Sequence, residues 1–216
     1  MRKVFIFDFD GTFYSGEHKF DNVGPTIEKN RRKFLPHISD EEYENICREN
    51  PKWMKAITGN DISKCIYSFK KKYPNLEFSV RDFCDWQNNN SYDIIIDYNQ
   101  IVDIKFMETL CKEYSVYVVS NSSLHHIYHY MNKIGINKNW FKGIFSNEFI
   151  EEDPSKEHYY KDILNIEKCK PHNVYIFGDS VGADLAPALH LGINAFYVDN
   201  ALSIKALVTK VLENEV

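Results

Sequence analysis

The sequence predicts an α/β protein whose core is a doubly wound, Rossmann-like parallel sheet, with a small α-helical domain inserted into it. Five short runs rich in Val, Ile, Phe and Tyr do not alternate with polar residues, a pattern typical of strands buried on both faces. Helical patterns separate the last four runs, and strands that alternate with helices form a right-handed parallel sheet. A long helical interval after the first run predicts the insertion.

The predicted core alternates strands and helices along the chain. In order, the predicted strands are Val4–Phe7, Val116–Val119, Ile144–Phe145, Val174–Phe177 and Ala195–Val198. The predicted core helices are Ile104–Tyr114, Leu124–Ile134, His158–Leu164, Asp184–Leu191 and Ile204–Leu212. Gly135 and Gly192 follow two of these helices, where glycine commonly ends a helix because it tolerates a left-handed backbone.

The interval between the first strand and the first core helix is too long for a single crossover, and its signals are helical. Helical patterns cover Pro25–Leu35, Tyr43–Arg48, Ile62–Tyr73 and Val80–Trp86. Ser39 and Glu42 form a capping box before the second of these patterns. We therefore expect residues 1–15 and 96–216 to form one core domain and residues 16–95 to form an inserted helical domain.

The composition is that of a globular protein with no general attraction for polyanions. Of the 216 residues, 44% are hydrophobic and 26% are charged, which excludes a disordered or low-complexity chain. The formal net charge of -5 gives no electrostatic pull toward nucleic-acid polymers or anionic membranes. The five cysteines form no CxxC pair, so we expect a reduced, cytoplasmic protein without zinc-ribbon or thioredoxin chemistry.

Polar residues stand where the predicted strands end. Those at the first, second and fourth strands are Asp8, Asp10, Ser120, Asn121, Asp179 and Asp184. Ligands of open parallel sheets bind outside the carboxyl ends of the strands, so we expect these residues to converge on one site. Several carboxylates at one site need a cation, and an open site of hard oxygen ligands suits Mg²⁺.

The first of these clusters, DFDGT at residues 8–12, has the groups needed for phosphoryl transfer. A strand-end aspartate beside Mg²⁺ can act as a nucleophile, which is the role expected for Asp8. Asp10 lies two residues after Asp8, so in an extended chain its side chain points to the same face as that of Asp8. It can serve first as general acid and then as general base. Thr12 offers a hydroxyl, and Ser120 with the backbone N–H groups before the next helix can bind phosphate oxygens.

These motifs resemble those of the haloacid dehalogenase superfamily, most of whose members are phosphatases. Residues 8–12 look like its first motif, residues 118–121 (VVSN) its second, and residues 178–180 (GDS) with Asp184 its fourth. The helical insert is similar in position to the first type of cap domain in that family. The resemblance implies an aspartyl-phosphate mechanism in which Asp8, the main-chain carbonyl of Asp10 and Asp179 hold Mg²⁺, and Asp184 acts through the metal's water shell. The dehalogenase and phosphonatase branches lack the acid at Asp10, so its presence favours phosphate esters.

The third motif of the family carries a lysine, often followed by proline, and here the sequence departs from it. A gapless match to Lys-Pro places Asp153 where the lysine should stand. Lys156 lies shortly after it, at the start of the next predicted helix. We expect Lys156 to bind the phosphoryl oxygens, because a phosphate site without a lysine would lose a large electrostatic contribution.

The sequence therefore predicts a cytoplasmic, Mg²⁺-dependent phosphatase acting on a small phosphorylated metabolite, such as a sugar phosphate, a nucleoside monophosphate or a phospho-acid. A phosphomutase of the same fold and a catalytically idle phosphate-binding module remain alternatives. His125 and His129 have a spacing that can bind zinc, but no carboxylate third ligand is evident nearby. An ordinary histidine face on the helix is the favoured interpretation of this pair.

Overall fold

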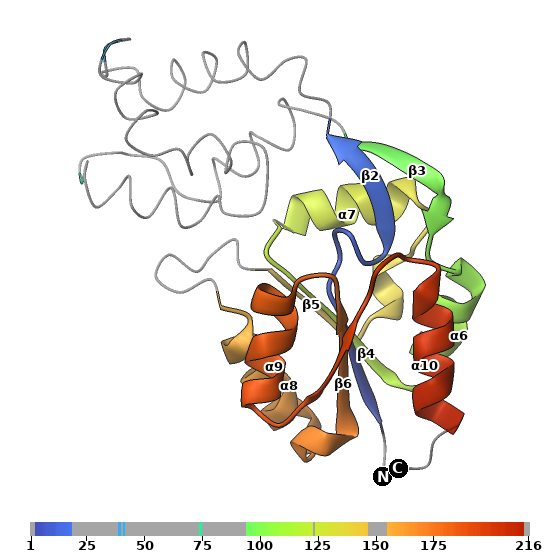
Figure 1. Cartoon of the computed structure of the whole chain (residues 1–216), viewed down its shortest axis with the longest axis vertical. Helices are drawn as coiled ribbons and strands as arrows, with labels where there is room; N and C mark the ends of the chain where they lie inside the picture. Colours follow the sequence, from blue (N-terminus) through green and yellow to red (C-terminus); the bar gives the residue numbers. More distant parts are fainter. Residues whose placement is uncertain are drawn as a thin grey trace.

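The core of the protein is a five-stranded parallel sheet in the order β5-β4-β1-β6-β7 (Figure 1). The structure is a computed structural model and describes residues 3–18, 39, 41, 74, 94–122, 124–146 and 155–213. The strands are β1 (Val4–Phe7), β4 (Ser115–Ser120), β5 (Gly143–Ser146), β6 (Val174–Gly178) and β7 (Asn194–Tyr197). Every neighbouring pair in this sheet is parallel, which confirms the predicted sheet.

The strand order determines where a ligand site can form. The chain begins at the centre of the sheet with β1, passes outward through β4 to β5, and then crosses back to β6 on the other side of β1. The point where the order reverses is the usual ligand crevice of a doubly wound sheet, at the carboxyl ends of the strands. In this chain that point lies at the end of β1, between β4 and β6.

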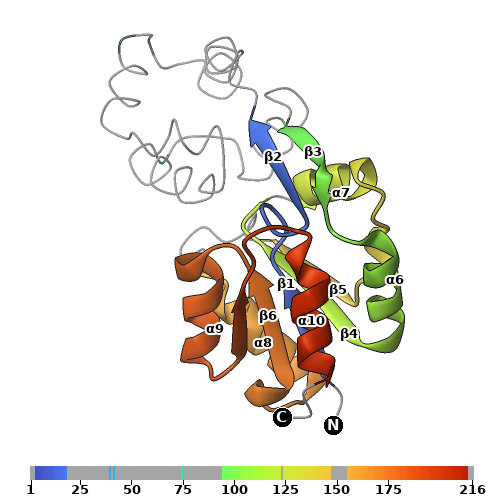
Figure 2. The same ribbon diagram turned by 45° about the vertical axis from the view of Figure 1, so that its right-hand side comes forward.

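Helices cover both faces of the sheet, so the core has three layers (Figures 1 and 2). They are α6 (Ile104–Glu113), α7 (Leu124–Lys133), α8 (Glu157–Glu167), α9 (Ala186–His190) and α10 (Ser203–Glu213). Residues of α6, α7 and α10 share one buried apolar cluster with Phe5 and Phe7, whereas residues of α8 and α9 share another with Val4 and Ile6. Alternate side chains of β1 thus enter opposite clusters, which explains why this strand is apolar throughout.

A second, two-stranded antiparallel sheet was not expected from the sequence. It pairs β2 (Tyr14–His18) with β3 (Ile94–Ile101). The predicted domain boundaries, 15/16 and 95/96, therefore fall inside these two strands. The helices predicted between them lie outside the described residues.

The helix predicted at Asp184–Leu191 has two parts. A single wide π-helical turn, Val181–Leu185, comes first, and α9 continues from Ala186 to His190. Pro187 stands at the start of α9 and has no backbone N–H to donate into the preceding turn. Such wide turns are frequent at functional sites, and this one carries Asp184.

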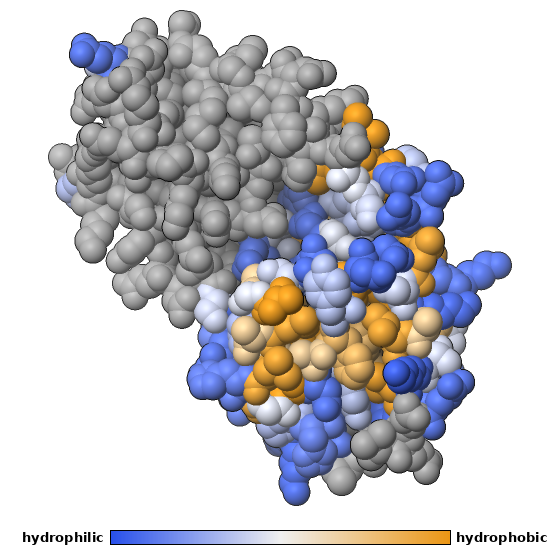
Figure 3. Space-filling model, in the orientation of Figure 1, coloured by the Kyte–Doolittle hydropathy of each residue, from blue (hydrophilic) through white to orange (hydrophobic). Residues whose placement is uncertain are grey.

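The surface near the last strand is partly apolar. Figure 3 shows hydrophobic residues gathered on the part of the core where α9, β7 and α10 lie. Exposed apolar side chains of these segments and their flanking turns include Leu189, Tyr197 and Leu202. Among the described helices, none is long and apolar enough to cross a membrane.

Candidate active site

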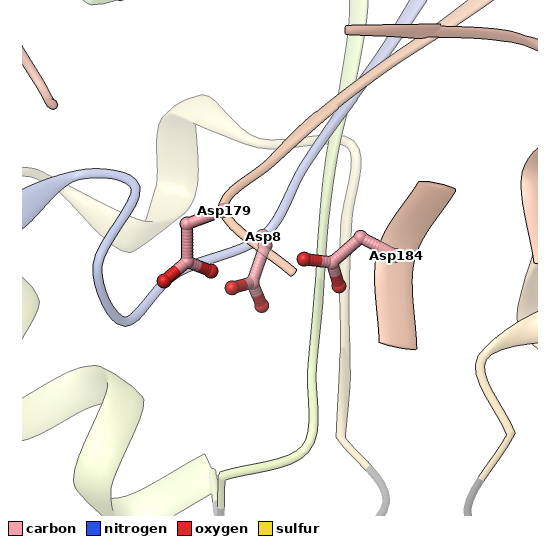
Figure 4. A group of neighbouring side chains, drawn as sticks. All are labelled: Asp8, Asp179 and Asp184. Carbon is pink, nitrogen blue, oxygen red and sulfur yellow. The ribbon is translucent and has the colours of Figure 1, made fainter. Parts of the chain in front are cut away.

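Three aspartates meet at the carboxyl end of the sheet. Asp8 directly follows β1, Asp179 directly follows β6, and Asp184 comes from the π-helical turn beyond it. Each offers a carboxylate oxygen, and these oxygens all lie within 4.8 Å of one another. Figure 4 shows Asp8 between the other two, with the carboxylate of Asp184 pointing toward it. The convergence expected of these three residues is therefore present in the structure.

Two glycines make this close approach possible. The backbone N–H of Asp8 donates to the carbonyl of Phe177 at 2.9 Å, so β1 and β6 are still paired where the site begins. Gly11 has a φ of +75°, and a Cβ there would lie 2.2 Å from Oδ2 of Asp179. A Cβ on Gly178 would lie 2.4 Å from Oδ2 of Asp184. Any larger residue at either position would displace a carboxylate of the cluster.

Lys156 lies between two of the carboxylates. Its Nζ donates to Oδ1 of Asp8 at 2.6 Å and to Oδ1 of Asp184 at 2.5 Å. The side chain is 2% exposed, and it comes from the residue just before α8, on the face of the sheet opposite α7. A buried ammonium held by two carboxylates is not a solvated surface lysine. Asp153 lies outside the described residues.

The electrostatics of the cluster favour a further cation. Burial raises the pKa of Asp8 well above its usual value; Lys156 opposes this rise and Asp184 adds to it. Burial and the neighbouring Asp184 likewise raise the pKa of Asp179. Three carboxylates and one ammonium leave two negative charges without compensation. A divalent cation fits this oxygen set, because its charge would offset the excess and let all three aspartates ionise.

Asp10 has an entirely different environment. Three side chains surround its carboxylate: Tyr14 Oη donates to Oδ1 at 2.6 Å, and Ser122 Oγ donates to Oδ2 at 2.5 Å. His126 Nε2 lies 2.8 Å from Oδ1. Burial alone would raise the pKa of Asp10, but the interaction with His126 and the hydrogen bonds from all three partners together lower it. The free protein therefore holds Asp10 as a carboxylate.

The remaining predicted site residues lie around these two aspartates. Ser120 ends β4, is buried, and its Oγ accepts a hydrogen bond from the backbone N–H of Ser122 at 3.1 Å. Thr12 is fully buried, and its hydroxyl oxygen has no hydrogen-bond partner among the described residues. Asn121 follows Ser120 and is half-buried. The structure thus brings Thr12 and Ser120 to the carboxyl-end side of the sheet, as predicted.

Neither His126 nor His129 belongs to a group of potential metal ligands among the side chains that the structure describes. His126 faces Asp10, whereas His129 is exposed, and its ring packs edge-on against Tyr130 at 5.0 Å between centroids. The three-aspartate cluster is the one group of potential metal ligands found among the described residues. The side chain of His125 is not among those described.

The sequence patterns do not predict the three partners of Asp10, which are Tyr14, Ser122 and His126. A signal was nevertheless present, because Ser122 follows a strand end and His126 lies in the first turn of the next helix, α7. Side chains at these two positions face the carboxyl edge of a parallel sheet.

The fold and the site define the class of protein: a doubly wound α/β enzyme core with an acidic cluster at its switch point. The family model of haloacid dehalogenase-like hydrolases matches residues 2–192, and the chain belongs to this family. The resemblance recognised in the motifs is thereby confirmed. A search of curated proteins finds no match to the chain.

Solved structures share the fold at low sequence identity. A 2-haloacid dehalogenase from Pseudomonas syringae superposes with a TM-score of 0.56 at 14% identity, over 98% of this chain and 100% of that one. A predicted haloacid dehalogenase-like (HAD-like) hydrolase from Porphyromonas gingivalis has a TM-score of 0.53 at 14% sequence identity, over 100% of both chains. A third structure is that of a HAD family enzyme from Bacteroides thetaiotaomicron in complex with magnesium and inorganic phosphate. It has a TM-score of 0.53 at 13% sequence identity, over 96% of this chain and 99% of that one.

Proposed function

We propose that the chain is a Mg²⁺-dependent phosphatase that hydrolyses a small phosphate ester through an aspartyl-phosphate on Asp8. The observation that carries the proposal is the pair of aspartates in opposite environments: Asp8 beside a buried lysine and two carboxylates, Asp10 among three hydrogen-bond donors. Two acids with such different surroundings suit a division into nucleophile and proton-transfer residue. A dehalogenase needs no second acid at the position of Asp10.

In the proposed first step, a carboxylate oxygen of Asp8 attacks phosphorus, and the bond from phosphorus to the alcohol oxygen breaks. Asp10 gives its proton to that oxygen, so the alcohol leaves neutral. The lowered pKa of Asp10 in the free protein requires that the substrate change it. The negative charge of a bound ester raises the pKa of a nearby carboxylate. The proton that Asp10 then gives to the alcohol oxygen comes from the ester itself, whose second ionisation has a pKa of about 6.

In the second step, Asp10 is again a carboxylate and takes a proton from water. The water oxygen bonds to phosphorus, the bond from phosphorus to Asp8 breaks, and orthophosphate leaves. Lys156 offsets charge on Asp8 and on the phosphoryl oxygens, and Ser120 and Thr12 offer hydroxyls to those oxygens. Asp8, Asp179, Asp184 and the main chain of Asp10 would hold Mg²⁺, which when bound supplies positive charge beside the phosphoryl group.

We further propose that residues 16–95 form a helical cap that selects the alcohol, and that the protein works in the cytoplasm on small metabolites. The magnesium and phosphate complex of the Bacteroides relative supports the ligand class, since the two chains share a fold. A phosphomutase is the second candidate, because transfer to another hydroxyl uses the same two aspartates. It would turn over without releasing phosphate.

The test is phosphate release from an aryl phosphate and from a panel of sugar phosphates, nucleoside monophosphates and phospho-acids. We expect release with Mg²⁺, none after exhaustive chelation, and none from Asp8→Asn. Asp162→Asn is the matched control, because Asp162 is an exposed aspartate on α8, and it should behave like the wild type. Halide release from 2-chloropropionate without phosphate release would instead identify a dehalogenase.

A further inference from the structure

The carboxylate of Asp10 is held by side chains from three separate elements. Tyr14 opens β2, Ser122 follows β4, and His126 lies in the first turn of α7. We propose that these three residues position Asp10 for proton transfer, leaving one oxygen, Oδ2, to face the reacting atoms. The inference rests on the proposed function, since it assigns residues that support the proton-transfer step of that reaction.

Counting acceptor sites identifies the oxygen that remains available. An ionised carboxylate accepts about four hydrogen bonds, two on each oxygen. Oδ1 of Asp10 already accepts from Tyr14 and lies at hydrogen-bond distance from Nε2 of His126, which fills both of its sites. Oδ2 takes one hydrogen bond, from Ser122. One site on Oδ2 is therefore left among the described contacts, and the proton can be given or taken only there.

The partners of Asp10 are themselves held in place. The ring of Tyr130 stacks on Tyr14, with centroids 5.6 Å apart and planes at 14°, and lies 4.7 Å from the ring of His126. Tyr130 is buried, and its hydroxyl accepts a hydrogen bond from the backbone N–H of Ile94 at 2.8 Å. A donor set locked by a buried aromatic ring is preorganised, which is what accurate proton transfer requires.

The inference predicts a defect that depends on the leaving group. In the first step the proton leaves Oδ2 of Asp10 for the alcohol oxygen as the bond from phosphorus to that oxygen breaks. An alkoxide cannot leave without the proton, whereas 2,4-dinitrophenolate leaves as an anion. In the second step Oδ2 takes a proton from water for either substrate. Loss of positioning should therefore slow the first step only for alkyl esters and slow the second step for both.

The closing experiment compares β-glycerophosphate with 2,4-dinitrophenyl phosphate, in the first turnover and at steady state. For His126→Ala we expect a loss of about 10²-fold in the first turnover with the alkyl ester, within the range of general acid catalysis. The first-turnover burst of dinitrophenolate should stay near the wild-type rate and then give way to a slow steady state. His126→Gln, which keeps an N–H near the position of Nε2, should recover part of the loss.

Two further variants make the test independent of folding defects. Ser122→Ala removes the hydroxyl bound to Asp10 but keeps the backbone bonds of residue 122, to Ser120 Oγ and from Ser146 Oγ. It should show the same dependence on the leaving group, to a smaller degree. His129→Ala is the matched control, since His129 contacts Tyr130 from the same helix but has no contact with Asp10 among the described contacts, and its kinetics should match the wild type.

The outcomes separate this inference from the proposed function. A wild type that releases phosphate from neither ester overturns the proposed function. An active wild type in which His126→Ala and Ser122→Ala slow the burst with both esters equally, or change neither, overturns the positioning role alone. An equal loss in His129→Ala would show that the packing of α7, and not the contact with Asp10, is responsible.

Discussion

Replacing Lys156 by methionine removes one positive charge from the centre of the acidic cluster while keeping most of the side-chain volume. The Nζ atom of Lys156 bonds Asp8 at 2.6 Å and Asp184 at 2.5 Å, and the side chain is 2% exposed. Methionine fills the space of the apolar stem and leaves both carboxylates without this partner. The substitution therefore tests the charge and not the packing.

The expected cost follows from the burial of all three groups. Breaking a buried ion pair by removing one partner costs about 3–5 kcal/mol, because the remaining charge stays buried without compensation. Loss of one preorganised charge that stabilises the transition state costs about 10²–10³-fold in kcat. Without Lys156, the pKa of Asp8 rises further, since the positive neighbour that opposes the rise is gone. Asp8, the proposed nucleophile, is then protonated more of the time.

The assay is urea unfolding in chelator and in excess Mg²⁺, together with kcat for an aryl phosphate. We expect Lys156→Met to lose most stability in chelator and less in Mg²⁺, because the divalent cation offsets part of the missing charge. Lys161→Met is the control: Lys161 pairs with Glu157 at 2.7 Å but is 56% exposed. Such a surface pair should change stability by less than about 1 kcal/mol and leave kcat unchanged.

Normal turnover in Lys156→Met would show that the charge of Lys156 does not contribute to catalysis. A second comparison addresses the shifted third motif. Asp153→Ala removes the residue that a gapless match to Lys-Pro would place at the lysine position, and we expect little effect on kcat. A severe loss of kcat in Asp153→Ala with a normal kcat in Lys156→Met would show that Lys156 is not the residue of the third motif.

Four shorter predictions concern the aspartates. Asp8→Asn should fold yet lose at least about 10³-fold in turnover, which steady-state kinetics and a melting curve measure together. Excess Mg²⁺ at 100 times its Kd should stabilise the wild type by about 2.7 kcal/mol, and Asp179→Asn should abolish most of that gain in a thermal shift experiment. Gly11→Ala, whose Cβ would lie 2.2 Å from Asp179, should lose both the Mg²⁺ shift and activity. In chelator, the free energy of unfolding should fall as pH rises from about 4. The pKa values of Asp8 and Asp179 are raised in the folded protein, so the unfolded chain loses the protons of these carboxyl groups at lower pH than the folded one. Measuring the free energy of unfolding against pH checks the direction of this change.

The sheet could be predicted because strands buried on both faces are apolar at every position and do not alternate with polar residues. Val4–Phe7 is apolar at every position, since its alternate side chains enter two different apolar clusters. The strand Tyr14–His18 carries no such pattern; it forms by pairing with Ile94–Ile101, a segment far away in the chain. Tertiary pairing of this kind overrides local propensity and cannot be seen in one segment alone.

The convergence of Asp8, Asp179 and Asp184 could be predicted from the sequence, whereas the side chains that surround Asp10 could not. Asp8 and Asp179 follow neighbouring strands, so their approach depends only on strand order. The contact of His126 with Asp10 depends on the direction of a helical side chain relative to a loop. Sequence spacing fixes which residues share a helix face, but not which of them meets an aspartate from another element.

The proposed nucleophile, Asp8, and the proposed Mg²⁺ influence each other through their charges, which gives a final prediction. The pKa of Asp8 is raised by burial and by Asp184, so in the metal-free protein its nucleophilic carboxylate form is lost as pH falls toward that raised value. A divalent cation at the cluster favours the ionised form and lowers that pKa. The acidic limb of the profile of kcat/KM against pH should therefore move to lower pH as Mg²⁺ is increased. Measuring the profile at two Mg²⁺ concentrations tests this, with the exposed-aspartate variant Asp162→Asn as control. An acidic limb that stays fixed would mean that Asp8 does not limit the reaction at low pH, and that another group must be assigned to this limb.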